Sequence, residues 1–117
     1  MTWNAPPVVA RTPEGKVKDG IKAWLDEHGA YWYMVVPTGY SRAGVPDFIA
    51  CVGGRFVGIE AKAPGKRRTT TPLQRKELRA IDAAHGVAIV VDDASQLNTL
   101  LGGDFDVRTG AKQGSGP

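Results

Sequence analysis

Several features that define common classes of protein are scarce in this chain of 117 residues. It has one cysteine, Cys51, which cannot form an internal disulfide, so a disulfide-stapled secreted scaffold is excluded. No apolar run approaches the roughly 18 residues that a membrane-spanning helix needs, so we expect no membrane contact. The first residues lack a basic segment followed by an apolar stretch. We therefore expect no signal peptide and a cytoplasmic setting, in a bacterium or a phage-infected cell.

A strong excess of one charge is also missing. Lys and Arg number 15 against 12 Asp and Glu, which gives a net charge of +3. This modest excess suits a polyanionic partner, but an ordinary solvated basic surface explains it equally well. Hydrophobic residues make up 42% of the chain, enough to build a core, and the length indicates one compact domain.

Periodicity divides the chain into an N-terminal arm at 1–11, a folded domain at 12–101 and a Gly-rich tail at 102–117. Within the domain we expect helices over 12–28 and 71–85, strands over 31–36 and 87–91, a β-hairpin within 44–62 that turns at Gly53-Gly54, and a short helix over 94–101. The strand over 31–36 has apolar side chains on both faces, which is typical of a central strand. This order predicts an α/β fold with a small mixed β-sheet flanked by helices.

The predicted hairpin within 44–62 contains an unusual pair of acidic residues. Gly53-Gly54 between two β-rich runs predicts a two-residue turn, and counting outward from it places Asp47 opposite Glu60. Because side chains alternate, Asp47, Glu60 and Lys62 share one face. Directly opposed like charges destabilise a sheet, so this pair indicates a function. Two carboxylates at this spacing suit a hard divalent cation such as Mg²⁺.

Two further polar side chains lie on faces that are otherwise apolar. On a helical wheel Glu14 sits within roughly 20° of Ile21 and Leu25. A first-turn acid that complements the helix dipole is the simpler explanation for it. Gln74 follows Thr71 by three residues and fits a capping box, but its amide can also point toward the acidic pair. We expect that one amide cannot serve both roles fully.

The sequence resembles a known family at these positions. Pro46-Asp47, a spacer and Glu60-Ala61-Lys62 resemble the PD-(D/E)xK nuclease core. Gly44 before them and Thr71-Pro72-Leu73-Gln74 after them are similar to the VRR-NUC family, whose small stand-alone members occur in phages and bacteria. The resemblance covers about residues 11–93. It implies a restriction-endonuclease-like fold with an αβββαβ core.

The resemblance also implies a reaction, the hydrolysis of phosphodiester bonds in DNA with Mg²⁺ as cofactor and Mn²⁺ as a substitute. The metal ligands that it implies are Glu14, Asp47, Glu60 and the backbone carbonyl of Ala61. The catalytic residues that it implies are Asp47, Glu60, Lys62 and Gln74. Lys62 would position or deprotonate the attacking water, or stabilise the pentacovalent state, and these roles stay open. Gln74 would orient Lys62 or the water.

Basic residues surround this constellation. Lys66, Arg67 and Arg68 lie in a loop directly after Lys62, and beside a carboxylate–metal site we interpret them as a phosphate clamp. A charge run is more commonly just a solvated surface. Arg42 lies in the loop that leads into the hairpin, where an ordinary polar loop is the alternative to a phosphate contact. The predicted DNA-binding residues are Arg42, Lys66, Arg67, Arg68 and Arg75.

The substrate follows from the resemblance and from size. Small stand-alone VRR-NUC proteins look like Holliday-junction resolvases, enzymes of DNA repair that act as two-fold dimers. The chain is too short for a separate recognition domain, which favours recognition of DNA shape and backbone. We therefore expect a homodimer that cuts branched or junction DNA. The alternatives are a nuclease of the same fold without junction preference and a non-catalytic DNA-binding module.

Overall fold

The structure is a computed structural model that describes residues 11–102, so nearly all of the expected arm and of the tail lie outside the described residues. The elements are α1 (Pro13–Glu27), β1 (Tyr31–Met34), β2 (Phe48–Val52), β3 (Arg55–Ala61), α2 (Pro72–Ala83), β4 (Val87–Val91) and η1 (Asn98–Gly102), a π-helix. This order confirms the predicted α/β class. No helix within residues 11–102 has the length and apolar character required to cross a membrane.

Both α-helices begin where their capping residues predict. The Thr12 hydroxyl accepts a hydrogen bond from the Gly15 N–H at 3.0 Å, and Pro13 takes the first helical position. Thr71 and Gln74 form a complete capping box at the start of α2. These caps matter for function because the first turn of each helix contains a predicted site residue.

The sheet has four strands in the order β1-β2-β3-β4. β1 pairs with β2 and β2 with β3 in antiparallel fashion, whereas β3 and β4 are parallel. The predicted hairpin register is confirmed from Val52 opposite Arg55 to Phe48 opposite Ile59. Gly53 and Gly54 both have positive φ, at 58° and 82°, as a two-residue hairpin turn of this type requires.

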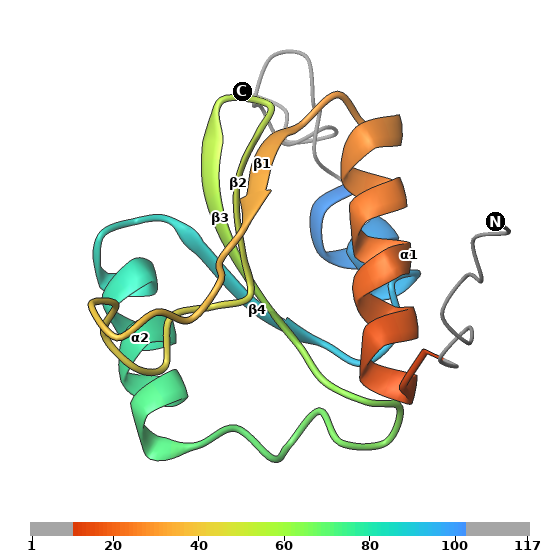
Figure 1. Ribbon diagram of the computed structural model, residues 1–117. Helices are drawn as coiled ribbons and strands as arrows, with labels where there is room; N and C mark the ends of the chain where they lie inside the picture. Colours follow the sequence, from red (N-terminus) through yellow and green to blue (C-terminus); the bar gives the residue numbers. More distant parts are fainter. Residues whose placement is uncertain (1–10, 103–117) are drawn as a thin grey trace, which may run out of the picture.

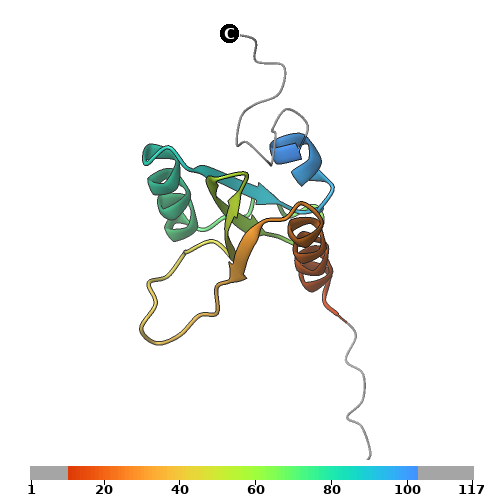
Figure 2. The ribbon, with the colours of Figure 1, turned by 90° about the horizontal axis from the view of Figure 1, so that it is seen from above.

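The prediction of a central first strand was wrong, because β1 lies at the edge of the sheet and ends at Met34. Tyr31 and Tyr33 are 80% and 55% exposed. The helices explain why: α1 covers one face of the sheet, and α2 lies on the opposite face (Figure 1, Figure 2). There α2 packs on β4 and reaches Gly58 of β3 through Ile81, so the β1–β2 half of this face stays open. The parallel pairing of β4 was predicted correctly, but β4 is the other edge strand and is mostly half-buried.

The core lies between α1 and the sheet and is closed by the segment that contains η1. Its largest fully buried side chains include Ile21, Leu25, Phe48, Ile59 and Leu97. The indole N–H of Trp24 donates to Asn98 Oδ1 at 2.8 Å and ties η1 to α1. The predicted short helix over 94–101 is present with shifted bounds, because helical residues cover 96–102 and those from Asn98 form the π-helix η1. Asp93 accepts hydrogen bonds from the backbone and hydroxyl of Ser95 in the turn that precedes these residues.

Candidate active site

The predicted site residues meet at one end of the sheet, where β3 ends and both α-helices begin. Figure 1 shows the segment between β3 and α2 passing below the sheet, from the first turn of α1 to that of α2. Asp47 directly precedes β2, Glu60 lies near the end of β3, and Lys62 follows it. Glu14 and Gln74 lie in the first turns of α1 and α2.

The two hairpin carboxylates lie together as the register requires. Asp47 Oδ2 accepts the Ala61 N–H at 2.8 Å, which fixes the Asp47 side chain against β3. Glu60 is only 4% exposed and is the one buried charged residue in the part of the chain that the structure describes. Burial raises the pKa of Glu60 from 4.5 to about 8. The charge of Asp47 and a hydrogen bond with it add to this rise, and the Lys62 ammonium opposes it.

Gln74 links the acidic pair to Lys62. Its amide Nε2 donates to Glu60 Oε1 at 3.0 Å, and its Oε1 accepts from Lys62 Nζ at 2.9 Å. The same Oε1 also accepts the Thr71 N–H at 2.9 Å, which completes the capping box. The expectation that one amide cannot serve both roles is therefore wrong. An amide oxygen has two lone pairs and the nitrogen two donors, so helix cap and site share one side chain.

Glu14 reaches the site through a residue that the sequence analysis missed. Lys18 Nζ lies 3.4 Å from Glu14 Oε2 and 3.6 Å from Asp47 Oδ1. The only signal in the sequence is the spacing of four residues from Glu14, which places Lys18 on the same helix face. Within residues 11–102 no three His, Cys, Asp or Glu side chains converge as a ready-made metal site. The role of Glu14 as a metal ligand therefore stays a prediction.

The acidic pair itself fits a hard divalent cation. Its donors are all oxygens, and Asp47 Oδ1 is not used by the backbone bond that holds Oδ2. The pKa of Glu60 is raised because burial and the Asp47 charge disfavour its ionised form. A cation bound at the pair would favour that ionised form. Ala61 contributes its N–H to Asp47, and its carbonyl as a metal ligand stays a prediction. Mg²⁺ and Mn²⁺ both take such donors.

The predicted DNA-binding residues flank this end of the sheet, and several have partners within the protein. Arg42 pairs with Glu77 of α2, Arg67 donates to the Val90 carbonyl at 2.9 Å, and Arg75 donates to the Thr70 carbonyl. The loop after β3 is tied down, since the Gly65 N–H donates to Asp92 Oδ2 at 2.9 Å. Lys66 and Arg68 are exposed in the same loop. Contact with DNA stays a prediction for all five basic residues.

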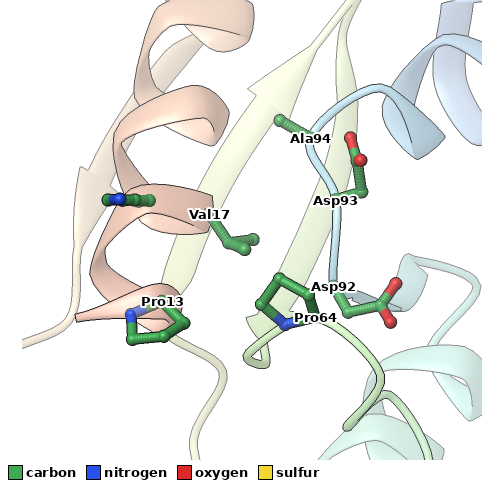
Figure 3. A pocket seen from close by; sticks show the side chains of 7 residues that line it. Pro13, Val17, Pro64, Asp92, Asp93 and Ala94 are labelled. Carbon is green, nitrogen blue, oxygen red and sulfur yellow. The ribbon is translucent and has the colours of Figure 1, made fainter.

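Two hollows adjoin the site. One, of about 220 Å³, includes Asp47 and is lined by Val35, Pro37, Thr38, Ser41, Arg42, Ala43, Gly44 and Val45 as well. The other, of about 450 Å³, lies between α1 and the segment after β4 and is lined by Pro13, Lys16, Val17, Pro64, Asp92, Asp93 and Ala94 (Figure 3). None of the residues of this second hollow is a predicted catalytic residue. The first hollow thus contains a predicted catalytic residue, Asp47, and the second contains none.

Comparison with known proteins agrees with this geometry. No family model matches the chain. The chain is 30% identical over 89 residues to a protein named "Putative nuclease p44" from Acyrthosiphon pisum secondary endosymbiont phage 1. The match covers 75% of this chain and 90% of that protein. A solved structure described as a VRR_NUC domain superposes with a TM-score of 0.61 at 25% identity, covering 76% of this chain and 94% of the other. The chain belongs to the VRR-NUC family of nucleases.

Proposed function

We propose that this protein is a metal-dependent DNA endonuclease. The observation that carries the proposal is the acidic pair Asp47–Glu60, which one amide, that of Gln74, connects to the Lys62 ammonium. A fold has no structural reason to bury Glu60 beside another carboxylate. A divalent cation bound to the pair would supply an activated water and offset the charge that builds on the phosphate.

The protein groups then have separate tasks. Asp47 is held by the Ala61 N–H, and Glu60 by the Gln74 amide, so both carboxylates keep fixed positions. The Lys62 ammonium lies 2.9 Å from Gln74 Oε1 on the same side of the sheet as Glu60. There it can orient the attacking water, take up its proton or stabilise negative charge on the phosphate. Such pre-arranged groups reduce the reorganisation that the reaction requires.

DNA is the proposed substrate, and its backbone is the proposed point of contact. The hollow at Asp47 contains two hydroxyl side chains and Arg42, and the loop with Lys66, Arg67 and Arg68 lies beyond Lys62. Hydroxyls and cations on both sides of an acidic pair suit phosphate contacts, which position a duplex without reading its sequence. Recognition of this kind selects for DNA shape.

For the DNA structure we propose branched DNA such as the four-way junction, cut by a homodimer. The support is the resemblance of small stand-alone VRR-NUC proteins to junction resolvases. A two-fold dimer would place one site on each of two paired strands. The exposed edge of β1, with Tyr31 and Tyr33, is compatible with self-association.

The test is a cleavage assay on labelled four-way junction and matched linear duplex, with Mg²⁺, Mn²⁺ or chelator. Wild type is compared with Lys62→Ala and with Lys76→Ala, which removes an exposed lysine of α2 outside the site. We expect paired, metal-dependent nicks in the junction from wild type and Lys76→Ala, and none from Lys62→Ala. The DNA affinity of Lys62→Ala, measured by gel shift, should change little.

The other outcomes separate the alternatives. Equal cutting of duplex and junction would retain the nuclease and reject the junction preference. Binding without cutting in any metal would favour a non-catalytic DNA-binding module. Sedimentation analysis of the free protein and of its junction complex tests the dimer, and a monomer in both states would reject it.

A further inference from the structure

Lys18, near the start of α1, lies between two acidic side chains of the candidate site. Its ammonium lies between Glu14 of the same helix and Asp47, which precedes β2, at 3.4 and 3.6 Å. The Lys18 side chain is 25% exposed and that of Asp47 is 23% exposed. Exposed ion pairs contribute little, but this one is half-buried and joins α1 to the catalytic end of the hairpin.

The surrounding charges give Lys18 a specific role. Asp47 adjoins the buried Glu60, and the negative charges of Asp47 and Glu14 both disfavour the ionised form of Glu60. Lys62 is the other cation at this end, but its Nζ donates to Gln74 Oε1. Among the ion pairs of residues 11–102, only that with Lys18 involves Asp47.

Lys18 also competes for an atom that the metal would need. Asp47 Oδ2 already accepts the Ala61 N–H, so Oδ1 is the oxygen that the backbone does not hold, and Lys18 lies beside it. A divalent ion such as Mg²⁺ binds carboxylate oxygens at about 2.0–2.1 Å and would repel an ammonium at the present position of Lys18. The long, flexible lysine stem allows the ammonium to leave.

We propose that Lys18 is the resident cation of the metal-free site and that a divalent metal must displace it to bind. Lys18 thereby raises the metal concentration at which the site fills, and it acts as a positioning residue and not as a catalytic one. This inference rests on the proposed metal-dependent function, because it assigns the competitor for that metal.

The test measures metal binding directly, without DNA. Mn²⁺ is titrated calorimetrically into wild type, Lys18→Met, Lys18→Gln and the charge-retaining Lys18→Arg. Lys22→Met is the control, since it removes a lysine one turn further along α1 that forms none of the described ion pairs. We expect Lys18→Met and Lys18→Gln to bind Mn²⁺ about tenfold more tightly, because a unit charge close to the ion is incompletely screened in a half-buried site. Lys18→Arg and Lys22→Met should bind like wild type.

Thermal unfolding gives a second readout that also detects a folding defect. In chelator, Lys18→Met should unfold at a lower temperature than Lys22→Met, because the acidic groups lose their cation. Added Mn²⁺ should raise the midpoint of Lys18→Met by more than it raises that of wild type. If Lys18→Met is unfolded in chelator but folds with Mn²⁺, the same conclusion holds.

Failure of this inference differs from failure of the proposed function. Equal Mn²⁺ affinity in wild type, Lys18→Met and Lys18→Gln would overturn the role of Lys18 and leave the metal site in place. Absence of Mn²⁺ binding in all variants would overturn the metal site itself, and the inference with it. If Lys22→Met also bound Mn²⁺ more tightly, the change in net charge alone would explain the result, and the proposed role of Lys18 would be overturned.

Discussion

Replacing Gln74 tests the shared use of one amide by the helix cap and the site. Gln74→Ala removes the donor to buried Glu60, the acceptor for Lys62 and the acceptor for the Thr71 N–H. With its pKa near 8, Glu60 is protonated and neutral at neutral pH, so leaving it buried without the Gln74 donor costs about 1–3 kcal/mol, and losing half of a capping box costs roughly 0.5–1 kcal/mol. Lys62 can exchange its lost partner for water at little cost, since it is only half-buried. We therefore expect a loss of about 2–4 kcal/mol in the free energy of unfolding.

Two companion variants separate the cap from the site. Thr71→Ala removes the hydroxyl that accepts the Gln74 N–H at 3.1 Å and touches no catalytic side chain, so it should cost about 1 kcal/mol and preserve cleavage. Gln74→Glu keeps a capping-box residue and an acceptor for Lys62 but replaces the donor to Glu60 by a carboxylate. Its destabilisation should be small while Glu60 is protonated and should grow as the pH rises through about 8.

The assays are urea denaturation of metal-free protein and single-turnover cleavage in Mg²⁺. We expect Gln74→Ala to reduce cleavage by about 10²-fold, the order of loss that follows when catalytic groups shift by about 1 Å. The reasoning is refuted if Gln74→Ala destabilises no more than Thr71→Ala. In that case the amide would act only as a cap, and its contacts with Glu60 and Lys62 would contribute nothing.

Three other predictions follow from the site and its supports. The pKa of Glu60 is raised from 4.5 to about 8 in the folded protein, so between these pH values the folded state binds a proton that the unfolded state has released. The free energy of unfolding of metal-free wild type, measured with urea, should therefore fall by a few kcal/mol as the pH rises from 4.5 to about 8, and that of Glu60→Gln should not. Gly44 has φ 89°, and an added Cβ would lie 2.5 Å from the Leu73 backbone, so Gly44→Ala should lower the thermal midpoint far more than Gly54→Ala, where φ is 82° but no atom lies within 4 Å. Arg67→Ala should weaken DNA binding and reduce the slope of log affinity against log salt by about 1, whereas an unchanged slope would remove Arg67 from the phosphate contacts.

The elements that local chemistry determines were predictable from the sequence. Thr12 and Thr71 mark the helix starts because each side chain caps its own backbone. The hairpin register followed from Gly53–Gly54, since a two-residue turn leaves only one pairing and therefore brings Asp47 to Glu60. The acidic pair could thus be found by counting.

Features that depend on packing could not be predicted. The burial of β1 depends on how far α2 extends over the sheet, and the apolar run Tyr31–Val36 contains no information on that. The sequence predicts only that Lys18 pairs with Glu14 on the same helix, because its contact with Asp47 depends on where α1 packs. The dual role of Gln74 was judged wrongly because the contacts of each amide atom depend on where α2 begins relative to β3.

The close approach of Gly44 to the first turn of α2 has a consequence for how substrate binding reaches the catalytic groups. The loop around Gly44 lines the hollow at Asp47, and its Arg42 pairs with Glu77 on α2. At Gly44 the backbone has no room for even a methyl group against Leu73 and Gln74. If DNA enters the hollow at Asp47 as proposed, a shift of this loop would push directly on the Leu73–Gln74 peptide. The fit of the substrate would then be coupled to the position of the Gln74 side chain through this backbone contact and the Arg42–Glu77 pair, so a poorly seated DNA would also misalign Lys62.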